Sequence, residues 1–154
     1  MENKIKIIKA ICNIYKESNN KEDSIFSYLL NWAFRDITNA KPVEYVSKAA
    51  LQMAKEKKVD LSKANYSALS KLDPNKEWLY YEHCNPIKEL RLALLNDNKE
   101  VEKIIEKDFI CWVTREENKE LDKRGYRDKR PGGWKKCYKE CGIKVLENKG
   151  DLYV

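Results

Sequence analysis

The chain has 154 residues, of which 42% are hydrophobic and 36% charged, and its formal net charge is +6. This length and composition fit one compact, soluble unit with a buried core, and they exclude a long disordered chain. Only five glycines and four prolines occur, which is too few for a turn-dense all-β fold.

No apolar run approaches the length of about 20 residues that a membrane helix needs, so no membrane association is expected. At the N-terminus, lysines and isoleucines follow a helical spacing, unlike the continuous apolar core of a secretory signal. The five cysteines are an odd number, and most of them lie in apolar patterns, which is typical of reduced thiols. We therefore expect a cytoplasmic protein.

The first 73 residues are predicted to form a helical subdomain. Apolar residues recur at helical spacing in four segments, at 5–15, 22–37, 46–53 and 66–72. The second of these segments is apolar on most sides, so its helix is expected to lie centrally in the molecule. The Asp-Pro-Asn turn at 73–75 is the expected subdomain boundary.

Residues 74–154 are predicted to form an α+β subdomain that ends in a basic segment. Aromatic and β-branched runs predict strands at 77–82 and 109–113, and two more around the Asn-Lys-Gly turn at 148–150. Thr114 and Glu117 have the spacing of a capping box. The expected fold is α+β and predominantly helical: about four N-terminal helices packed on a C-terminal half with about three or four strands, as one compact unit.

Positive charge is concentrated between Lys123 and Lys144, where nine basic residues stand against two acidic ones. The net charge of this basic segment is +7, whereas the other 132 residues sum to −1. Such an excess attracts polyanions, and an aromatic ring among the cations can stack on bases. The residues predicted to contact nucleic acid or a nucleoprotein are Arg124, Arg127, Lys129, Arg130, Trp134, Lys135, Lys136 and Lys139.

Two other interpretations of the basic segment stay open. The same cations would also bind an acidic patch on a protein partner. Alternatively, the lysines form an ordinary solvated face and Trp134 belongs to the core. The three arginines of the segment favour an anionic partner, because lysine is abundant throughout this chain and arginine is not.

His83 is the only histidine, and it lies in Glu82-His83-Cys84-Asn85-Pro86 between a predicted strand and a predicted helix. At such a junction a histidine can act as a general base. These five residues resemble the opening of HNH-type nuclease motifs, although that family continues into a strand and here a helix is expected from Ile87. If the strand continues, Glu82 and His83 point to opposite faces and cannot act together. In the alternative interpretation, Glu82 or His83 satisfies backbone groups at the helix start.

Other chemistry has little support in the sequence. His83 and Cys84 with Cys137 and Cys141 are the only possible zinc ligands, and their spacing is not that of a zinc finger, so no metal is expected. No phosphate-binding glycine loop or nucleophile elbow is present, so no cofactor is expected.

The leading hypothesis is a small factor that binds nucleic acid or a nucleoprotein through its basic C-terminal surface and has no catalytic activity. A phage or mobile-element protein that inhibits or modulates a nucleic-acid enzyme would fit this description. The alternative is a nuclease or other phosphodiesterase with His83 and Glu82 at its active site. The sequence favours neither RNA nor DNA and predicts no oligomeric state.

Overall fold

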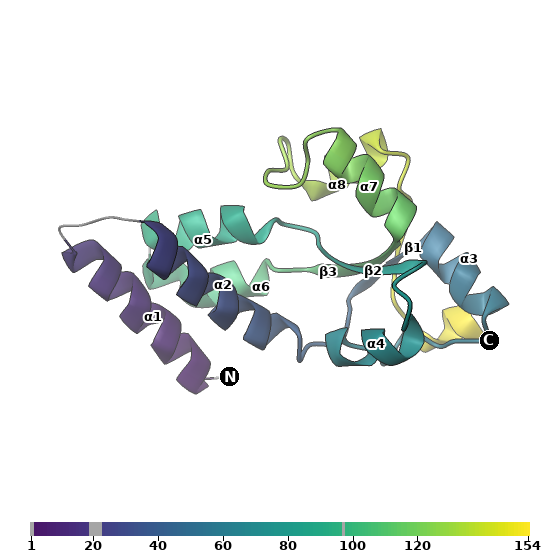
Figure 1. Cartoon of the computed structure of the whole chain (residues 1–154), viewed down its shortest axis with the longest axis horizontal. Helices are drawn as coiled ribbons and strands as arrows, with labels where there is room; N and C mark the ends of the chain where they lie inside the picture. The colour runs from purple at the N-terminus through teal and green to yellow at the C-terminus, as the bar shows by residue number, and fades with distance from the viewer. Residues whose placement is uncertain (1, 19–22, 97) are drawn as a thin grey trace.

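The structure, a computed structural model, describes residues 2–18, 23–96 and 98–154. Within them lie eight α-helices and a four-stranded mixed sheet, which confirms the predicted α+β, predominantly helical fold. Figure 1 shows two parts side by side along the longest axis of the molecule. We call them the helical lobe, a group of four helices, and the sheet lobe, which holds the strands and their flanking helices.

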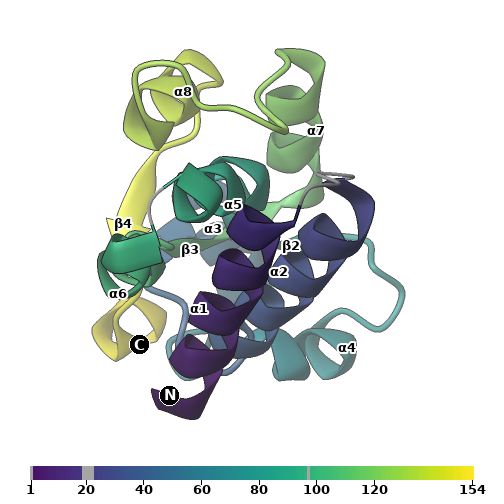
Figure 2. The ribbon, with the colours of Figure 1, turned by 90° about the vertical axis from the view of Figure 1, so that its left-hand side faces the viewer.

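The helical lobe consists of α1 (Glu2–Glu17), α2 (Asp23–Thr38), α5 (Ile87–Asn96) and α6 (Val101–Glu106). Figure 2 shows α1 and α2 side by side in front of α5 and α6. Their apolar faces meet in one core, because each helix repeats its apolar residues every three or four positions. Fully buried members of this core include Ile8, Leu30, Phe34 and Leu94. No helix in the described part of the chain is long and apolar enough to cross a bilayer.

The position of α2 differs from the prediction of a central helix. One side of α2 packs against α1 and α5, but the opposite side carries four exposed apolar residues: Ile25, Tyr28, Leu29 and Trp32. The helix is apolar on most sides, as the sequence indicates, yet its main packing partners among the described helices are α1 and α5. Residue 22, where this helix was expected to begin, lies outside the described residues.

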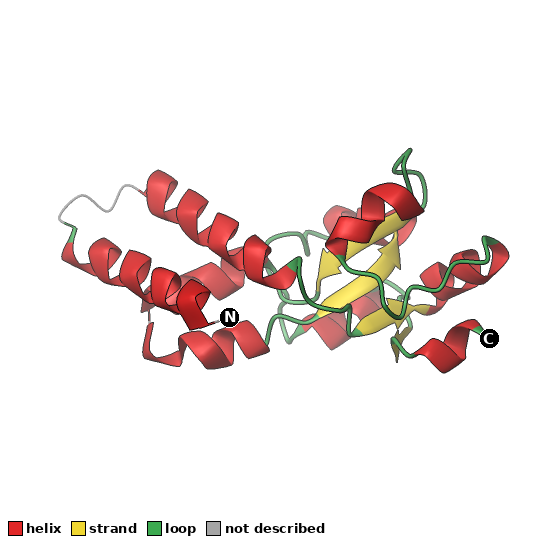
Figure 3. Cartoon of the chain, turned by 90° about the horizontal axis from the view of Figure 1, so that it is seen from below, coloured by secondary structure: helices red, strands yellow, loops and turns green. Residues whose placement is uncertain are grey.

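The sheet contains β1 (Tyr45–Ser47), β2 (Leu79–His83), β3 (Ile110–Thr114) and β4 (Val145–Glu147), in the order β2-β3-β1-β4. β1 runs parallel to β3, and the other two pairs are antiparallel. Every residue of β3 is buried, which suits a central strand rich in β-branched and aromatic residues. β2 lies at one edge of the sheet. Figure 3 shows the sheet, in yellow, beside the helical lobe.

Helices cover both faces of the sheet. On one side lie α3 (Lys48–Glu56), α4 (Leu69–Leu72) and the short 3-10 helix η3 (Gly150–Tyr153). On the other side lie α7 (Arg115–Lys123) and α8 (Trp134–Glu140), above the sheet in Figure 1. Successive residues of β3 alternate between the two cores: Trp112 packs on the α3 side and Val113 on the α7 side.

The division between the two lobes differs from the expected boundary at residue 73. β1 and α3 precede that residue and belong to the sheet lobe, whereas α5 and α6 follow it and belong to the helical lobe. The segment around residue 46 was expected to be wholly helical. Val46 and Ser47 instead lie in β1, which pairs with β3 and β4, and Ser47 caps α3 by accepting a hydrogen bond from the Ala50 N–H at 3.0 Å.

Two local predictions at the C-terminal half have different outcomes. The capping box is confirmed: Thr114 Oγ1 accepts from the Glu117 N–H at 3.1 Å, and the Glu117 carboxylate accepts from the Thr114 N–H at 2.8 Å. The expected hairpin at the end of the chain is wrong, because only β4 is a strand and η3 follows it. Asn148 donates to carbonyl oxygens of Val43 and Leu61, both at 3.0 Å, so tertiary contacts hold the segment that was expected to turn.

Candidate anion-binding cleft

A cleft of about 650 Å³ separates the helical lobe from the edge strand β2. α2 and α5 supply one wall, and α4, α7 and the loop before α8 supply the other. β2 contributes four consecutive residues, 80–83. The elements that meet here come from distant parts of the chain, so the cleft exists only in the folded protein.

Cations dominate the charged residues of this cleft. Six of them line it: Arg35, Lys76, Lys88, Arg91, Arg115 and Arg127. Three acidic residues line it as well: Glu82, Asp122 and Asp128. Low-dielectric walls with an excess of one sign of charge concentrate the field, which favours ligands of the opposite sign.

Most of the cleft cations are not neutralised within the protein. Four of the six form no ion pair with any described residue: Arg35, Lys76, Arg91 and Arg127. In addition, Nε of Arg91 and Oδ1 of Asn31 are both buried without a hydrogen-bond partner in the described structure. Buried polar atoms are normally paired, so these two atoms are exceptions among the polar groups around the cleft.

Arg115 is held in place on the α7 side of the cleft. Its Nε lies 3.8 Å from a carboxylate oxygen of Asp73, and its guanidinium lies over the ring of Tyr80, 5.7 Å from the ring centre. Asp73 is almost completely buried and accepts backbone N–H bonds from residues 77, 78 and 79 at 2.9, 3.0 and 2.9 Å. Asp73 therefore fixes the start of β2 and lies within ion-pair distance of Arg115.

The charge of Asp73 stabilises the fold. Burial acts to raise the pKa of Asp73, but three backbone N–H groups and Arg115 outweigh it and lower the pKa below the ordinary value of 3.8. A lowered pKa stabilises the folded state above the ordinary pKa, and this stabilisation disappears as the pH falls through the folded-state pKa.

Asp73→Asn is therefore expected to lower the free energy of unfolding by about 2 kcal/mol at pH 7, because an amide replaces one of two accepting oxygens by a donor. Below about pH 4 the difference from the wild-type protein should shrink. Urea unfolding at several pH values measures both effects. Asp60→Asn is the matched control, since Asp60 is exposed and accepts one backbone N–H, from Ser62. Equal stability of Asp73→Asn and wild type at pH 7 would contradict the assignment.

Arg130 is not available to a polyanion, which corrects the prediction that it contacts nucleic acid. The residue is only 4% exposed, and its guanidinium pairs with the carboxylate of Glu82 on β2. Its backbone N–H donates to the Glu89 side chain of α5 at 3.0 Å. Arg130 thus joins the loop before α8 to both lobes. Burial raises the pKa of Glu82 to about 7, while Arg130 acts to lower it.

Trp134 is not available as a stacking surface either. It is 7% exposed, and its ring packs against Tyr45 and Tyr138, with ring centres 5.2 and 5.3 Å apart. The interpretation that places Trp134 in the core is the correct one. α8 buries its apolar face on the sheet, so its tryptophan faces inward and its lysines face outward.

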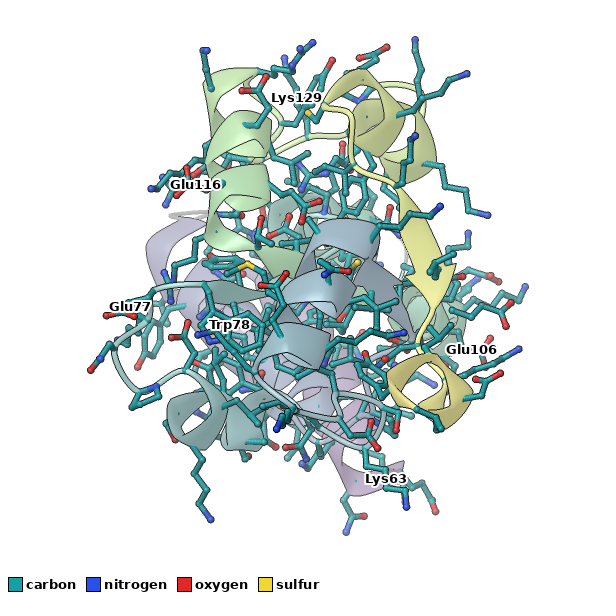
Figure 4. All side chains as sticks on the ribbon, turned by 90° about the vertical axis from the view of Figure 1, so that its right-hand side faces the viewer. Lys63, Glu77, Trp78, Glu106, Glu116 and Lys129 are labelled. Atoms are coloured by element: carbon teal, nitrogen blue, oxygen red, sulfur yellow. The ribbon has the colours of Figure 1, made fainter. Side chains whose placement is uncertain are left out.

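The other basic residues of the segment lie on the surface of the sheet lobe. Arg124 pairs with Glu120 at 2.7 Å, and Lys136 lies 3.9 Å from Glu140. Lys129, Lys135 and Lys139 are exposed on α8 and the loop before it. Figure 4 shows Lys129 at the outer end of this region, pointing away from the body of the molecule. Among the nine basic residues of the segment, Arg127 alone lines the cleft.

Glu82 and His83 point to opposite faces of the sheet, as the strand geometry predicts. Glu82 meets Arg130, whereas the Nδ1 atom of His83 lies 3.0 Å from an oxygen of Asp108. The ring of His83 also packs edge-on against Tyr81, with ring centres 5.9 Å apart. The histidine therefore has a carboxylate partner, but it is Asp108 and not its neighbour in sequence.

Sequence reasoning missed most of this cleft. Arg35, Arg91 and Arg115 lie on three different helices and form no local charge cluster. Asp108 carries no special spacing either, although it lies directly before a predicted strand. Within the described residues, no group of three or more His, Cys, Asp or Glu side chains could hold a metal ion, and all five cysteines are free thiols.

Comparisons with known proteins assign no function to the cleft. Protein-family models, curated proteins and solved structures give no significant match to the chain. Function is therefore inferred from the chemistry of the cleft itself.

Proposed function

We propose that this protein is a small nucleic-acid-binding factor that holds a single-stranded backbone in the cleft between its lobes. The observation that carries the proposal is the set of four cleft cations without a carboxylate partner among the described residues. Phosphate groups would neutralise them through charge-assisted hydrogen bonds.

Aromatic residues of the cleft support a strand with unpaired bases. Tyr66, Tyr80 and Tyr81 line it; Tyr81 is buried and Arg115 lies over the Tyr80 ring, whereas Tyr66 is 45% exposed. An exposed ring beside a cationic track is the usual platform on which single-stranded bases stack. Bases of a duplex are stacked on each other and would leave such a ring unused.

The basic segment has a secondary part in this proposal. Arg127 links it to the cleft, and the exposed Lys129, Lys135 and Lys139 would contact phosphates further along the strand. These contacts add affinity through charge alone. The five free thiols support a reducing location such as the cytoplasm for this activity.

Fluorescence anisotropy with a labelled single-stranded oligonucleotide tests the proposal on the wild-type protein. We expect binding whose logarithmic affinity falls linearly with the logarithm of the salt concentration, at about 0.7 per phosphate contacted. Duplex of the same sequence should bind more weakly, because its bases cannot reach the tyrosines.

An acidic protein surface is the competing partner, and a competition experiment separates the two. An excess of polyglutamate should displace the oligonucleotide poorly, because it carries charge but no bases to stack. Polyglutamate that competes as well as unlabelled oligonucleotide, or an oligonucleotide that does not bind at low salt, would contradict the proposal.

A further inference from the structure

His83 lies in the anion-binding cleft with only one of its ring nitrogens engaged. Its side chain is 15% exposed and contributes to the lining of the cleft. Nδ1 is bound to Asp108 at 3.0 Å, while Nε2 makes no hydrogen bond with any described residue. Asp108 is fully buried, and its other oxygen, Oδ2, has no partner in the described structure. The carboxylate is thus directed at the imidazole alone.

This arrangement gives the imidazole the form of a general base. When Nδ1–H donates to the carboxylate, the lone pair of the neutral ring is on Nε2. The carboxylate holds the ring in that tautomer and stabilises the imidazolium that forms when Nε2 accepts a proton. A histidine that only satisfied backbone groups would hydrogen-bond to the main chain. His83 instead contacts a buried carboxylate and lines a cleft that carries an excess of cations.

We propose that the cleft cleaves single-stranded RNA, with His83 as the general base and Asp108 as its positioning residue. This inference rests on the proposed function, since the strand must first occupy the cleft. Nε2 of His83 removes the proton of a ribose 2′-hydroxyl, and the 2′-oxygen forms a bond to the adjacent phosphorus. The bond from phosphorus to the 5′-oxygen breaks, and the imidazolium returns the proton to that oxygen through water.

The step is balanced without a further reactant. One strand becomes a fragment with a 2′,3′-cyclic phosphate and a fragment with a 5′-hydroxyl, and His83 ends as it began. Negative charge grows on the phosphoryl oxygens during the attack, and a cation of the cleft lining that lies beside them would stabilise it.

RNA is the substrate class that this set of groups fits. The substrate supplies its own nucleophile, so one base and several cations are sufficient for the reaction. DNA has no 2′-hydroxyl, and its strand would be bound by the same cations without being cleaved.

The test uses end-labelled RNA in EDTA, together with the same RNA carrying one 2′-deoxy position and with single-stranded DNA. We expect cyclic-phosphate products from RNA, no cleavage at the deoxy position, and bound but intact DNA. His83→Gln should lower the cleavage rate by about 100-fold or more. The glutamine amide can still donate to Asp108, so the fold and the affinity for uncleaved strand should be preserved.

Asp108→Asn separates a positioning role from a structural one. An asparagine can donate to Nδ1, which moves the ring proton to Nε2 and removes the base. We expect a lower kcat with unchanged KM and melting temperature, and partial rescue of kcat by Asp108→Glu. If Asp108→Asn does not fold, His83→Gln remains the deciding variant.

The possible failures are distinguishable. Four results would each overturn this inference and leave the proposed function intact. They are RNA that is bound but never cleaved, cleavage that His83→Gln leaves unchanged, cleavage of the 2′-deoxy position, and cleavage that EDTA abolishes. Absence of binding to any strand would overturn both. His83→Gln purified in parallel also controls for contaminating ribonuclease.

Discussion

Replacing Arg91 and Arg127 together by glutamate is expected to weaken the binding of single-stranded nucleic acid by about 100-fold. Each arginine would otherwise contribute a charge-assisted contact worth about 1.5 kcal/mol or more, and two such losses correspond to this change in Kd. The salt dependence should also fall by about 0.7 per lost phosphate contact. Anisotropy titrations at several salt concentrations measure both quantities.

The matched control is Lys135→Glu with Lys139→Glu. It changes the net charge by the same amount, but both lysines are exposed on α8, outside the lining of the cleft. We expect a much smaller loss of affinity from this pair. Melting temperatures of both double variants show whether the fold is intact, and Arg127→Glu alone serves if the change at Arg91 disturbs it. Equal losses in the two double variants would show that charge matters and the cleft does not.

Arg130→Leu is expected to lower the free energy of unfolding by about 3 to 5 kcal/mol, although the residue lies in the most basic part of the chain. The substitution leaves Glu82 buried without its cation, and breaking one side of a buried ion pair is costly. Chemical unfolding at pH 8 measures the change. Arg127→Leu is the control three residues away: it should leave stability within about 0.5 kcal/mol of wild type and weaken nucleic-acid binding instead.

The pH dependence of Arg130→Leu checks its cause. Burial raises the pKa of Glu82 from its ordinary 4.5 to about 7. Ionisation of Glu82 therefore lowers the stability of the wild-type fold as the pH rises from 4.5 to about 7. Without Arg130 its pKa should rise further, and the variant should therefore lose more stability at pH 8 than at pH 5. Replacing both partners by leucine should recover much of the loss. A destabilisation that is independent of pH would contradict the ion-pair explanation.

Local periodicity accounts for the parts of the fold that the sequence predicts well. The runs that become β2 and β3 are rich in aromatic and β-branched residues, and the capping box at Thr114 marks the start of α7. β1 could not be found in this way. It has three residues, and the apolar spacing of Val46 with Ala50 also fits the helix that follows it. Pairing with β3 and β4, which are distant in sequence, makes it a strand.

The same distinction applies to the site. Sequence alone shows an excess of cations near the C-terminus and a single histidine at a strand end, because both features can be read from residues that are neighbours in the chain. It cannot distinguish Arg127 from Arg130. The tertiary structure does so, because a carboxylate 48 residues away neutralises Arg130 and no described carboxylate reaches Arg127.

The amino-acid sequence by itself therefore determined the class of fold, most helix and strand positions and the excess of cations near the C-terminus. The tertiary structure decided where an anion could bind. A free arginine and a neutralised one differ in the side chains that surround them in the folded protein. Around the cleft, those side chains come from α2, α5, β2 and α7. Packing of the two lobes brings these elements together, and no local pattern in the chain records it.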